Sequence, residues 1–204
     1  MSASSDNPTV ADENGVDEQR RRFLLGSTAV VGAAGAAALG VQFLGSMAPS
    51  ARALAAGAPV EHDISKIEAG AQLTVEWRGK PVFIVNRTDE MLATLGANDD
   101  RLKDPECKNA VQPEYARNKF RAREENKNLL VLVGICTHLG CSPAYVPEMA
   151  TSLKSGWECA CHGSSFDIAG RVTSSSPAGT NLVVPPYAFI SDGLLLVGAD
   201  EVAA

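Results

Sequence analysis

Histidine and cysteine are scarce in this chain, and positive charge is in deficit. The 204 residues include three histidines and five cysteines, and 18 basic side chains against 24 acidic ones give a formal charge of −6. Nucleic-acid binding needs a basic surface that neutralises phosphates, so the absence of a basic patch excludes nucleic acid as a partner. A chain of this length has room for one folded domain and a targeting or anchoring segment.

The scarce residues are concentrated in two short segments of matched sequence. Residues 136–141 read Cys-Thr-His-Leu-Gly-Cys, and residues 159–164 read Cys-Ala-Cys-His-Gly-Ser. Each segment offers one thiolate and one imidazole to a metal centre. The cysteines left over, Cys141 and Cys161, occupy corresponding places and could bridge the two loops. Two thiolates with two imidazoles suit either a tetrahedral zinc ion or a two-iron cluster, and ligand identity alone leaves both open.

The residues around these ligands separate the two possibilities. The run Cys-Thr-His-Leu-Gly-Cys-Ser-Pro at 136–143, followed by Cys-x-Cys-His-Gly-Ser-x-Phe-Asp at 159–167, resembles the Rieske iron–sulfur proteins of quinol-cytochrome c reductases. The resemblance covers about residues 20 to 204. It implies an all-β, antiparallel Rieske domain with an ISP-like sandwich fold, one N-terminal transmembrane helix and one [2Fe-2S] cluster.

The same resemblance assigns the roles of the paired residues. It makes Cys136 and Cys159 the ligands of one iron, and it makes His138 and His162 the ligands of the other. The remaining cysteines, Cys141 and Cys161, then form a disulfide that clamps the loops. A disulfide persists only in an oxidising compartment, which agrees with export of the domain.

Two further residues receive functional roles from the family pattern. His162 is the ligand expected to meet the quinol oxygen and receive its proton, and Leu139 is expected to line the docking surface. Neutral imidazoles in place of two thiolates move such clusters to roughly −150 to +300 mV, where a quinol can reduce them. The second imidazole nitrogen carries a proton whose loss depends on the metal's oxidation state, so electron and proton uptake are coupled.

A structural zinc site is the alternative without redox chemistry. Such a site needs neither a third and fourth cysteine at matched places nor the small residues Gly140, Gly163 and Ser164 beside the ligands. Small residues let backbone N–H groups and a hydroxyl approach the sulfurs, where hydrogen bonds raise the reduction potential. We therefore expect Ser164 to contact the cluster.

One position departs from the family pattern. Many quinol-oxidising members have tyrosine where this chain has Phe166, and the phenol donates a hydrogen bond toward a cysteine ligand. Phe166 cannot donate, so the sequence predicts a reduction potential below that of the tyrosine-bearing relatives.

The N-terminal part indicates where this chemistry takes place. Residues 1–19 are polar and acidic and are expected to form a disordered tail. The run Arg-Arg-Arg-Phe-Leu at 20–24 resembles the twin-arginine export signal, which directs folded, cofactor-loaded proteins across the membrane. The alternative is a positive-inside anchor. Either possibility leaves the N-terminus in the cytoplasm and the domain outside.

Residues 23–47 contain no charged side chain, and 25 residues of helix exceed the roughly 30 Å hydrocarbon core of a bilayer. Residues 20–47 are therefore predicted to be export signal and transmembrane anchor. Small residues at 32, 36 and 40 favour packing against other membrane helices, although export signals are commonly rich in alanine and glycine. Signal-peptidase sites at 51–53 and 53–55 would release a soluble protein; retention is favoured because the uncharged run exceeds the usual length for cleavage.

The next boundary is a linker. Residues 48–59 are small and low in complexity, and the resemblance implies a flexible hinge that lets the head move between partners. Residues 60–204 form the predicted periplasmic domain. Within it we expect a hairpin of strands 73–77 and 82–85, and a helix from Thr88 to Gly96. We further expect a strand at 129–135 that delivers Cys136, and a final hairpin of 183–190 with 194–197.

Two segments of the domain lack a clear period. Residues 97–128 are heavily charged and are interpreted as a surface insertion, held by Tyr115, Phe120 and Cys107. Cys107 is expected to be a free, partly buried thiol, with an intermolecular bridge as the less favoured alternative. Residues 174–182 resemble the proline-bearing loop that covers the cluster in the family, but Gly179 stands where a second proline is usual.

The function implied by the resemblance is transfer of one electron from ubiquinol to the cluster and on to cytochrome c1. It implies a dimeric complex with cytochrome b and cytochrome c1 in the bacterial inner membrane, with this chain as a single-pass subunit. The small subunit of an arsenite oxidase is the rival, and the Ser-Pro at 142–143 and Val-Pro-Pro-Tyr at 184–187 speak against it. A soluble oxygenase ferredoxin is excluded because it needs neither membrane helix nor disulfide.

Overall fold

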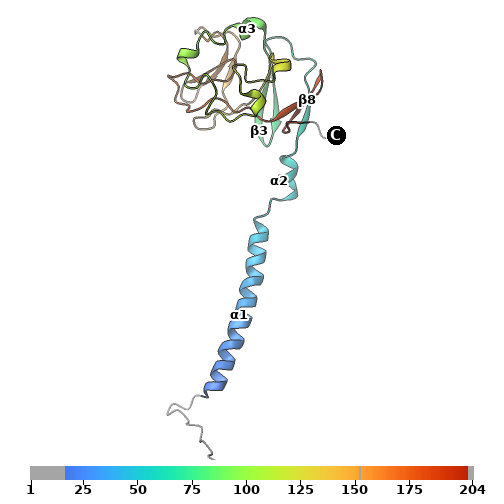
Figure 1. The fold of residues 1–204 in the computed structure, drawn as a ribbon, viewed down its shortest axis with the longest axis vertical. Coiled ribbons are helices and arrows are strands. Elements are labelled where there is room, and N and C mark those ends of the chain that lie inside the picture. The colour runs from blue at the N-terminus through green and yellow to red at the C-terminus, as the bar shows by residue number, and fades with distance from the viewer. Residues whose placement is uncertain (1–16, 152, 202–204) are drawn as a thin grey trace, which may run out of the picture. The chain divides into compact units, whose positions relative to one another are not determined.

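This computed structural model describes residues 17–151 and 153–201, and the chain divides into two compact units, Met1–Ser50 and Ala51–Ala204. The first unit contains the helix α1, Glu18–Ser46 (Figure 1). Its N-cap is Asp17, whose carboxylate accepts hydrogen bonds from the backbone N–H groups of Gln19 and Arg20. Capping by a carboxylate satisfies donors that the first turn leaves unpaired.

Helix α1 therefore begins before the boundary expected from the sequence. The predicted disordered tail, residues 1–19, ends inside it, because Asp17 caps the helix and Glu18 pairs with Arg22 across one turn. Residues 1–16 of that tail lie outside the described residues. With 29 residues, α1 is about 43 Å long at 1.5 Å per residue.

Length and composition make this helical region a candidate membrane span. Among the described residues, the stretch Glu18–Ala55 is the one that is long and apolar enough, with a mean hydropathy of 1.8 over an 18-residue window. No α1 residue is buried within the protein. A helix that could serve as the predicted anchor is thus present, with exposed apolar side chains along its length.

The second unit begins with a short helix, α2, Ala51–Ala56. The sequence predicted a flexible linker over residues 48–59, whereas the structure has a helix within it. The high helix propensity of alanine and leucine explains this helix. Immediately after it, the indole N–H of Trp77 donates to the carbonyl of Ala58 at 3.2 Å. The end of the linker is thereby attached to Trp77.

The remainder of the second unit is built from three antiparallel sheets of three strands each. Their strand orders are β1-β9-β8, β2-β3-β4 and β5-β6-β7. The strands are β1 (Val60–Asp63), β2 (Gln72–Trp77), β3 (Lys80–Asn86), β4 (Leu129–Val133), β5 (Ala144–Val146), β6 (Gly156–Cys159), β7 (Ser164–Asp167), β8 (Tyr187–Ser191) and β9 (Leu194–Val197). The predicted all-β antiparallel class is confirmed.

Short helices connect some of these strands. After β3 comes α3, Asp89–Ala93, and the 3₁₀ helices are η1 (Asp99–Arg101), η2 (Glu114–Ala116) and η3 (Glu124–Asn126). The predicted cap is correct, because the Thr88 hydroxyl accepts from the Met91 N–H. The helix ends before the predicted Gly96, and the C-cap is Thr94.

The β2–β3 hairpin forms as predicted, with Thr74 opposite Phe83 and Val75 opposite Val82. The final hairpin is shorter than predicted, because β8 begins only at Tyr187. Pro185 and Pro186 precede it, and proline cannot donate to a strand ladder. β4 ends at Val133, three residues before Cys136.

The hydrophobic core joins the β2-β3-β4 sheet to the β5-β6-β7 sheet. Trp157 of β6 is fully buried, stacks on Phe83 of β3 with ring centroids 6.3 Å apart, and donates its indole N–H to the Gln72 side chain at 2.8 Å. Tyr145 of β5 packs on the same indole and donates its hydroxyl to the Gly70 carbonyl. Aromatic packing with satisfied polar atoms fixes one sheet on the other.

The segment 97–128 is held by Tyr115, Phe120 and Cys107 as the sequence predicted, but it is more deeply buried than a surface insertion. Cys107, Ala116 and Arg121 are each at most 1% exposed, and Tyr115 and Phe120 pack against the core. The Arg121 guanidinium donates to the carbonyls of Ala169, Gly170 and Leu182. Its charge was taken as a sign of exposure, whereas hydrogen bonds to backbone carbonyls allow it to be buried.

Candidate metal centre

The two predicted ligand loops follow directly from strands and share one backbone turn. Cys136 lies after β4 and Cys159 ends β6. In the first loop the Gly140 N–H donates to the Cys136 carbonyl at 3.1 Å, and in the second the Gly163 N–H donates to the Cys159 carbonyl at 2.9 Å. Both glycines have positive φ, 88° and 72°, a conformation that side chains disfavour. The glycines are thus required by the turns themselves.

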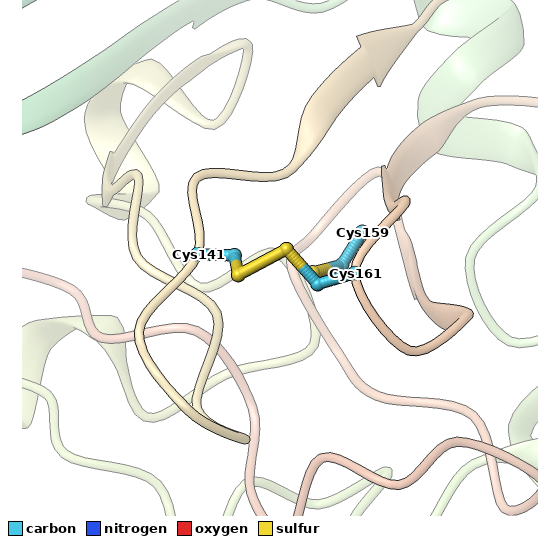
Figure 2. Close-up of side chains that lie close together, drawn as sticks. All are labelled: Cys141, Cys159 and Cys161. Atoms are coloured by element: carbon cyan, nitrogen blue, oxygen red, sulfur yellow. A yellow bond between two sulfur atoms is a disulfide. The ribbon is translucent and has the colours of Figure 1, made fainter.

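A disulfide joins the loops between Cys141 and Cys161, which are 20 residues apart (Figure 2). This is the pairing that the resemblance implied. Closing a loop of this size stabilises the fold by about 3 kcal/mol in the chain-entropy account. The sulfur of Cys159 lies within 4.8 Å of both disulfide sulfurs, but a bonded sulfur offers no thiolate. The disulfide therefore holds the loops, and a metal needs other ligands.

Two free thiols are available for that purpose. Cys136 and Cys159 are 2% and 3% exposed, and their sulfurs are in hydrogen-bond contact with each other. Burial raises the pKa of the Cys136 thiol above its ordinary value, although the His138 backbone N–H opposes this. A bound cation would deprotonate such thiols, so the pair is suited to hold a metal.

The two histidines, one from each ligand loop, contact each other. The rings of His138 and His162 are perpendicular, with centroids 4.7 Å apart. Nδ1 of His138 is buried without a hydrogen-bond partner among the described residues, and an orphaned buried nitrogen is costly unless it binds a ligand. His162 is exposed, as is Leu139 next to His138, with 72% of its surface accessible.

Polar groups around the thiols complete the site. The buried Ser164 side chain hydrogen-bonds the sulfur of Cys136. The Thr137 hydroxyl donates to the Thr180 carbonyl, which ties the first ligand loop to the 174–182 segment. The sequence analysis identified Ser164 but not the role of Thr137. The position of Thr137 between Cys136 and His138 was the one sequence feature that could have indicated that role.

The arrangement fits a [2Fe-2S] cluster with mixed ligands. The two loops that the disulfide clamps carry two buried thiols and two histidines in ring contact, one of them with an unpartnered ring nitrogen. Among the predicted ligands, the structure brings the two thiols into contact with each other and the two imidazoles into contact with each other. Cys107 is not among them: it is a free, buried cysteine near Asn181, and burial raises the pKa of its thiol.

Phe166 lies in β7 opposite Trp157 and is fully buried. We expect Phe166→Tyr to raise the reduction potential, because a phenol that reaches a ligand sulfur stabilises the reduced, more negative state. Each kcal/mol of such preference corresponds to about 40 mV for a one-electron couple. Redox titration of Phe166→Tyr beside the control Phe189→Tyr, on β8, measures the effect. Equal potentials in a folded Phe166→Tyr protein would contradict this explanation.

Fold, disulfide and donor set together define an electron-transfer protein of the Rieske type. The family described as "Rieske [2Fe-2S] domain" matches residues 115–187, and the cofactor of this chain is a [2Fe-2S] cluster. A second family, described as "Ubiquitinol-cytochrome C reductase Fe-S subunit TAT signal", matches residues 10–50. With the candidate membrane helix, this match fits a membrane-anchored subunit.

Relatives identify the particular family. The chain is 51% identical to the ubiquinol-cytochrome c reductase iron-sulfur subunit of Allochromatium vinosum, over 93% of each chain. It is 42% identical to that of Blastochloris viridis, over 93% of this chain and 98% of the relative. The chain belongs to the family of ubiquinol-cytochrome c reductase iron-sulfur subunits, which are electron-transfer subunits of an oxidoreductase complex. Among solved structures, a hyperthermophilic respiratory complex III chain matches with 25% identity and a TM-score of 0.44, over 85% of this chain and 98% of that one.

Proposed function

We propose that this chain takes one electron from ubiquinol and passes it to cytochrome c1, within a dimeric complex that also contains cytochrome b. The observation that carries the proposal is the contact of His138 and His162, with ring centroids 4.7 Å apart, from the same two loops that carry two buried thiols. Bound there, the cluster supplies a one-electron acceptor with a potential above that of four-cysteine clusters.

The proposal includes a ligand set drawn from the two loops. Cys136 and Cys159 hold one iron and His138 and His162 hold the other. The contact between the two buried thiols and the contact between the two perpendicular imidazoles support this assignment. Ser164 supports the centre by its contact with Cys136.

Quinol approaches from the side of the histidines. His162 is exposed and its free ring nitrogen accepts the hydrogen bond and the proton of the quinol hydroxyl. Leu139 is 72% exposed beside it, and an exposed leucine at a site of this kind provides apolar contact for a docking partner. In this proposal His162 is the catalytic residue, and Leu139 belongs to the docking surface.

The proposed topology is a single pass through the bacterial inner membrane. Residues 20–47 carry the twin-arginine signal and anchor, residues 48–59 are the hinge linker, and residues 60–204 are the periplasmic domain. The cytoplasmic N-terminus is supported by the arginines at 20–22, which follow the positive-inside rule. The periplasmic position is supported by the disulfide, which needs an oxidising compartment.

One experiment on the full chain in its own membranes tests these points together. The solubilised complex is expected to contain two irons per copy of this chain and b- and c-type haems. Its mixed-ligand [2Fe-2S] signal should appear in low-temperature EPR on reduction. Protease added to spheroplasts should digest the domain. Stoichiometric zinc without iron would leave a structural module, and co-purification with a molybdopterin subunit would favour the arsenite oxidase alternative.

A further inference from the structure

The segment 97–128 reaches the metal centre through Lys103. The backbone N–H of Lys103 donates to the Val172 carbonyl at 3.0 Å, and Leu102 pairs with Thr173 in an antiparallel bridge. The Arg101 carbonyl in turn accepts the Ser174 N–H at 2.7 Å. This short ladder fixes the backbone of Lys103 beside the start of the 174–182 segment.

The side chain of Lys103 then holds the middle of that segment. Its Nζ donates to the Ser176 carbonyl at 2.6 Å and to the Ala178 carbonyl at 2.8 Å. These carbonyls lie on the two sides of Pro177. Hydrogen bonds from an ammonium group are about twice as strong as neutral ones, and two of them fix the orientation of the peptide groups that they join.

Ala178 connects the Lys103 side chain to the metal centre. Its backbone N–H donates to the Ser164 hydroxyl oxygen at 3.1 Å, and the Ser164 side chain contacts the Cys136 sulfur. A serine hydroxyl has one proton and two lone pairs. When the Ala178 N–H occupies a lone pair, the proton of Ser164 is free to point at the sulfur.

We propose that Lys103 is a positioning residue for the iron–sulfur centre, which acts through Ala178 to direct the Ser164 hydroxyl at the Cys136 sulfur. The proposal rests on the proposed ligand set and adds a residue outside the family's ligand loops. A hydrogen bond to a ligand sulfur favours the reduced state, so Lys103 raises the reduction potential without touching the ligands.

Other contacts hold the segment at Ser176 and Leu182, whereas the described side chain that donates to the carbonyls of Ser176 and Ala178 is Lys103. At the start, the Ser176 hydroxyl accepts from the Ser165 N–H, and at the end the Leu182 N–H donates to the Gly170 carbonyl. The Ala178 side chain is fully buried, so loss of the lysine should tilt the peptide group rather than unfold the loop. Lys103 itself is an exposed residue, and its substitution is compatible with folding.

The test is a double-mutant cycle on the complex. Lys103→Met is expected to lower the reduction potential, and Lys103→Arg should restore most of the shift because it keeps the charged donors. The control Lys108→Met removes a lysine of the same segment that pairs only with the exposed Glu106 among the described residues, and it should leave the potential unchanged. In the Ser164→Ala background, Lys103→Met should produce no further shift.

Each result has a defined meaning. If Lys103→Met lowers the potential equally with and without Ser164, its charge acts through space and the positioning role is wrong. An unchanged potential in Lys103→Met also overturns it. Hydrogen exchange of the Ala178 amide, expected to accelerate in Lys103→Met, gives a second readout that does not depend on the cluster. Absence of a [2Fe-2S] signal in the unaltered protein would refute the proposed function instead.

Discussion

Replacing Cys159 with serine is expected to remove the iron centre, whereas replacing Cys107 with serine leaves it in place. Both cysteines are free and buried. Only Cys159 lies in a ligand loop, next to Cys136 and the disulfide. A hydroxyl is a poor ligand for iron in such clusters, which thiolates hold.

Iron content and the EPR signal of the two variants measure this difference. Cys159→Ser should contain no [2Fe-2S] signal and at least tenfold less iron per chain. Cys107→Ser should match the unaltered protein, because its sulfur contacts Asn181 rather than a ligand. A full cluster in Cys159→Ser would refute the ligand assignment, and loss of the cluster in both variants would show that the effect is one of folding.

Arg121→Ala is expected to destabilise the domain by about 3–5 kcal/mol. The guanidinium is fully buried, and it donates to the carbonyls of Ala169, Gly170 and Leu182 and to the Gln112 side chain. Burial lowers the pKa of Arg121 to about 10, so it is still charged at neutral pH. Its removal leaves several buried acceptors unpaired, each at a cost of about 1–3 kcal/mol.

The matched control is Arg117→Ala in the same segment. Arg117 forms an exposed ion pair with Glu114, and such pairs contribute about 0.2–1 kcal/mol. Urea unfolding of the two variants, followed by the fluorescence of Trp77 and Trp157, compares them. Because total stabilities are about 5–15 kcal/mol, Arg121→Ala should shift the midpoint strongly and Arg117→Ala little. Equal midpoints would mean that the 97–128 segment does not brace the domain.

The ligand loops and the 97–128 segment differ in how much of their structure the local sequence predicts. The two loops were predictable as a candidate metal site because their residues are local: cysteine, histidine and glycine occur at matched spacing in each loop. The Thr88 cap was predictable for the same reason, since its partner, the Met91 N–H, is three residues away.

The long-range hydrogen bonds of charged side chains were not predictable in this way. Arg121 and Lys103 occur in a stretch whose composition indicates a solvated surface, yet their partners lie about 50 to 75 residues further along the chain. Backbone carbonyls accept hydrogen bonds whatever side chain they carry, so no residue type marks them in the sequence. The short helix α2 was missed because its alanines and leucine were interpreted as low-complexity linker.

The sequence by itself determined the metal chemistry, the export signal and the all-β class, because each depends on residues that are near one another in the chain. Tertiary structure alone decided how the two loops are held. It places the imidazoles 4.7 Å apart, it joins the sheets through Trp157 and Phe83, and it brings Lys103 to the carbonyls beside Pro177. These contacts are long-range, and their geometry exists only once the sheets have packed.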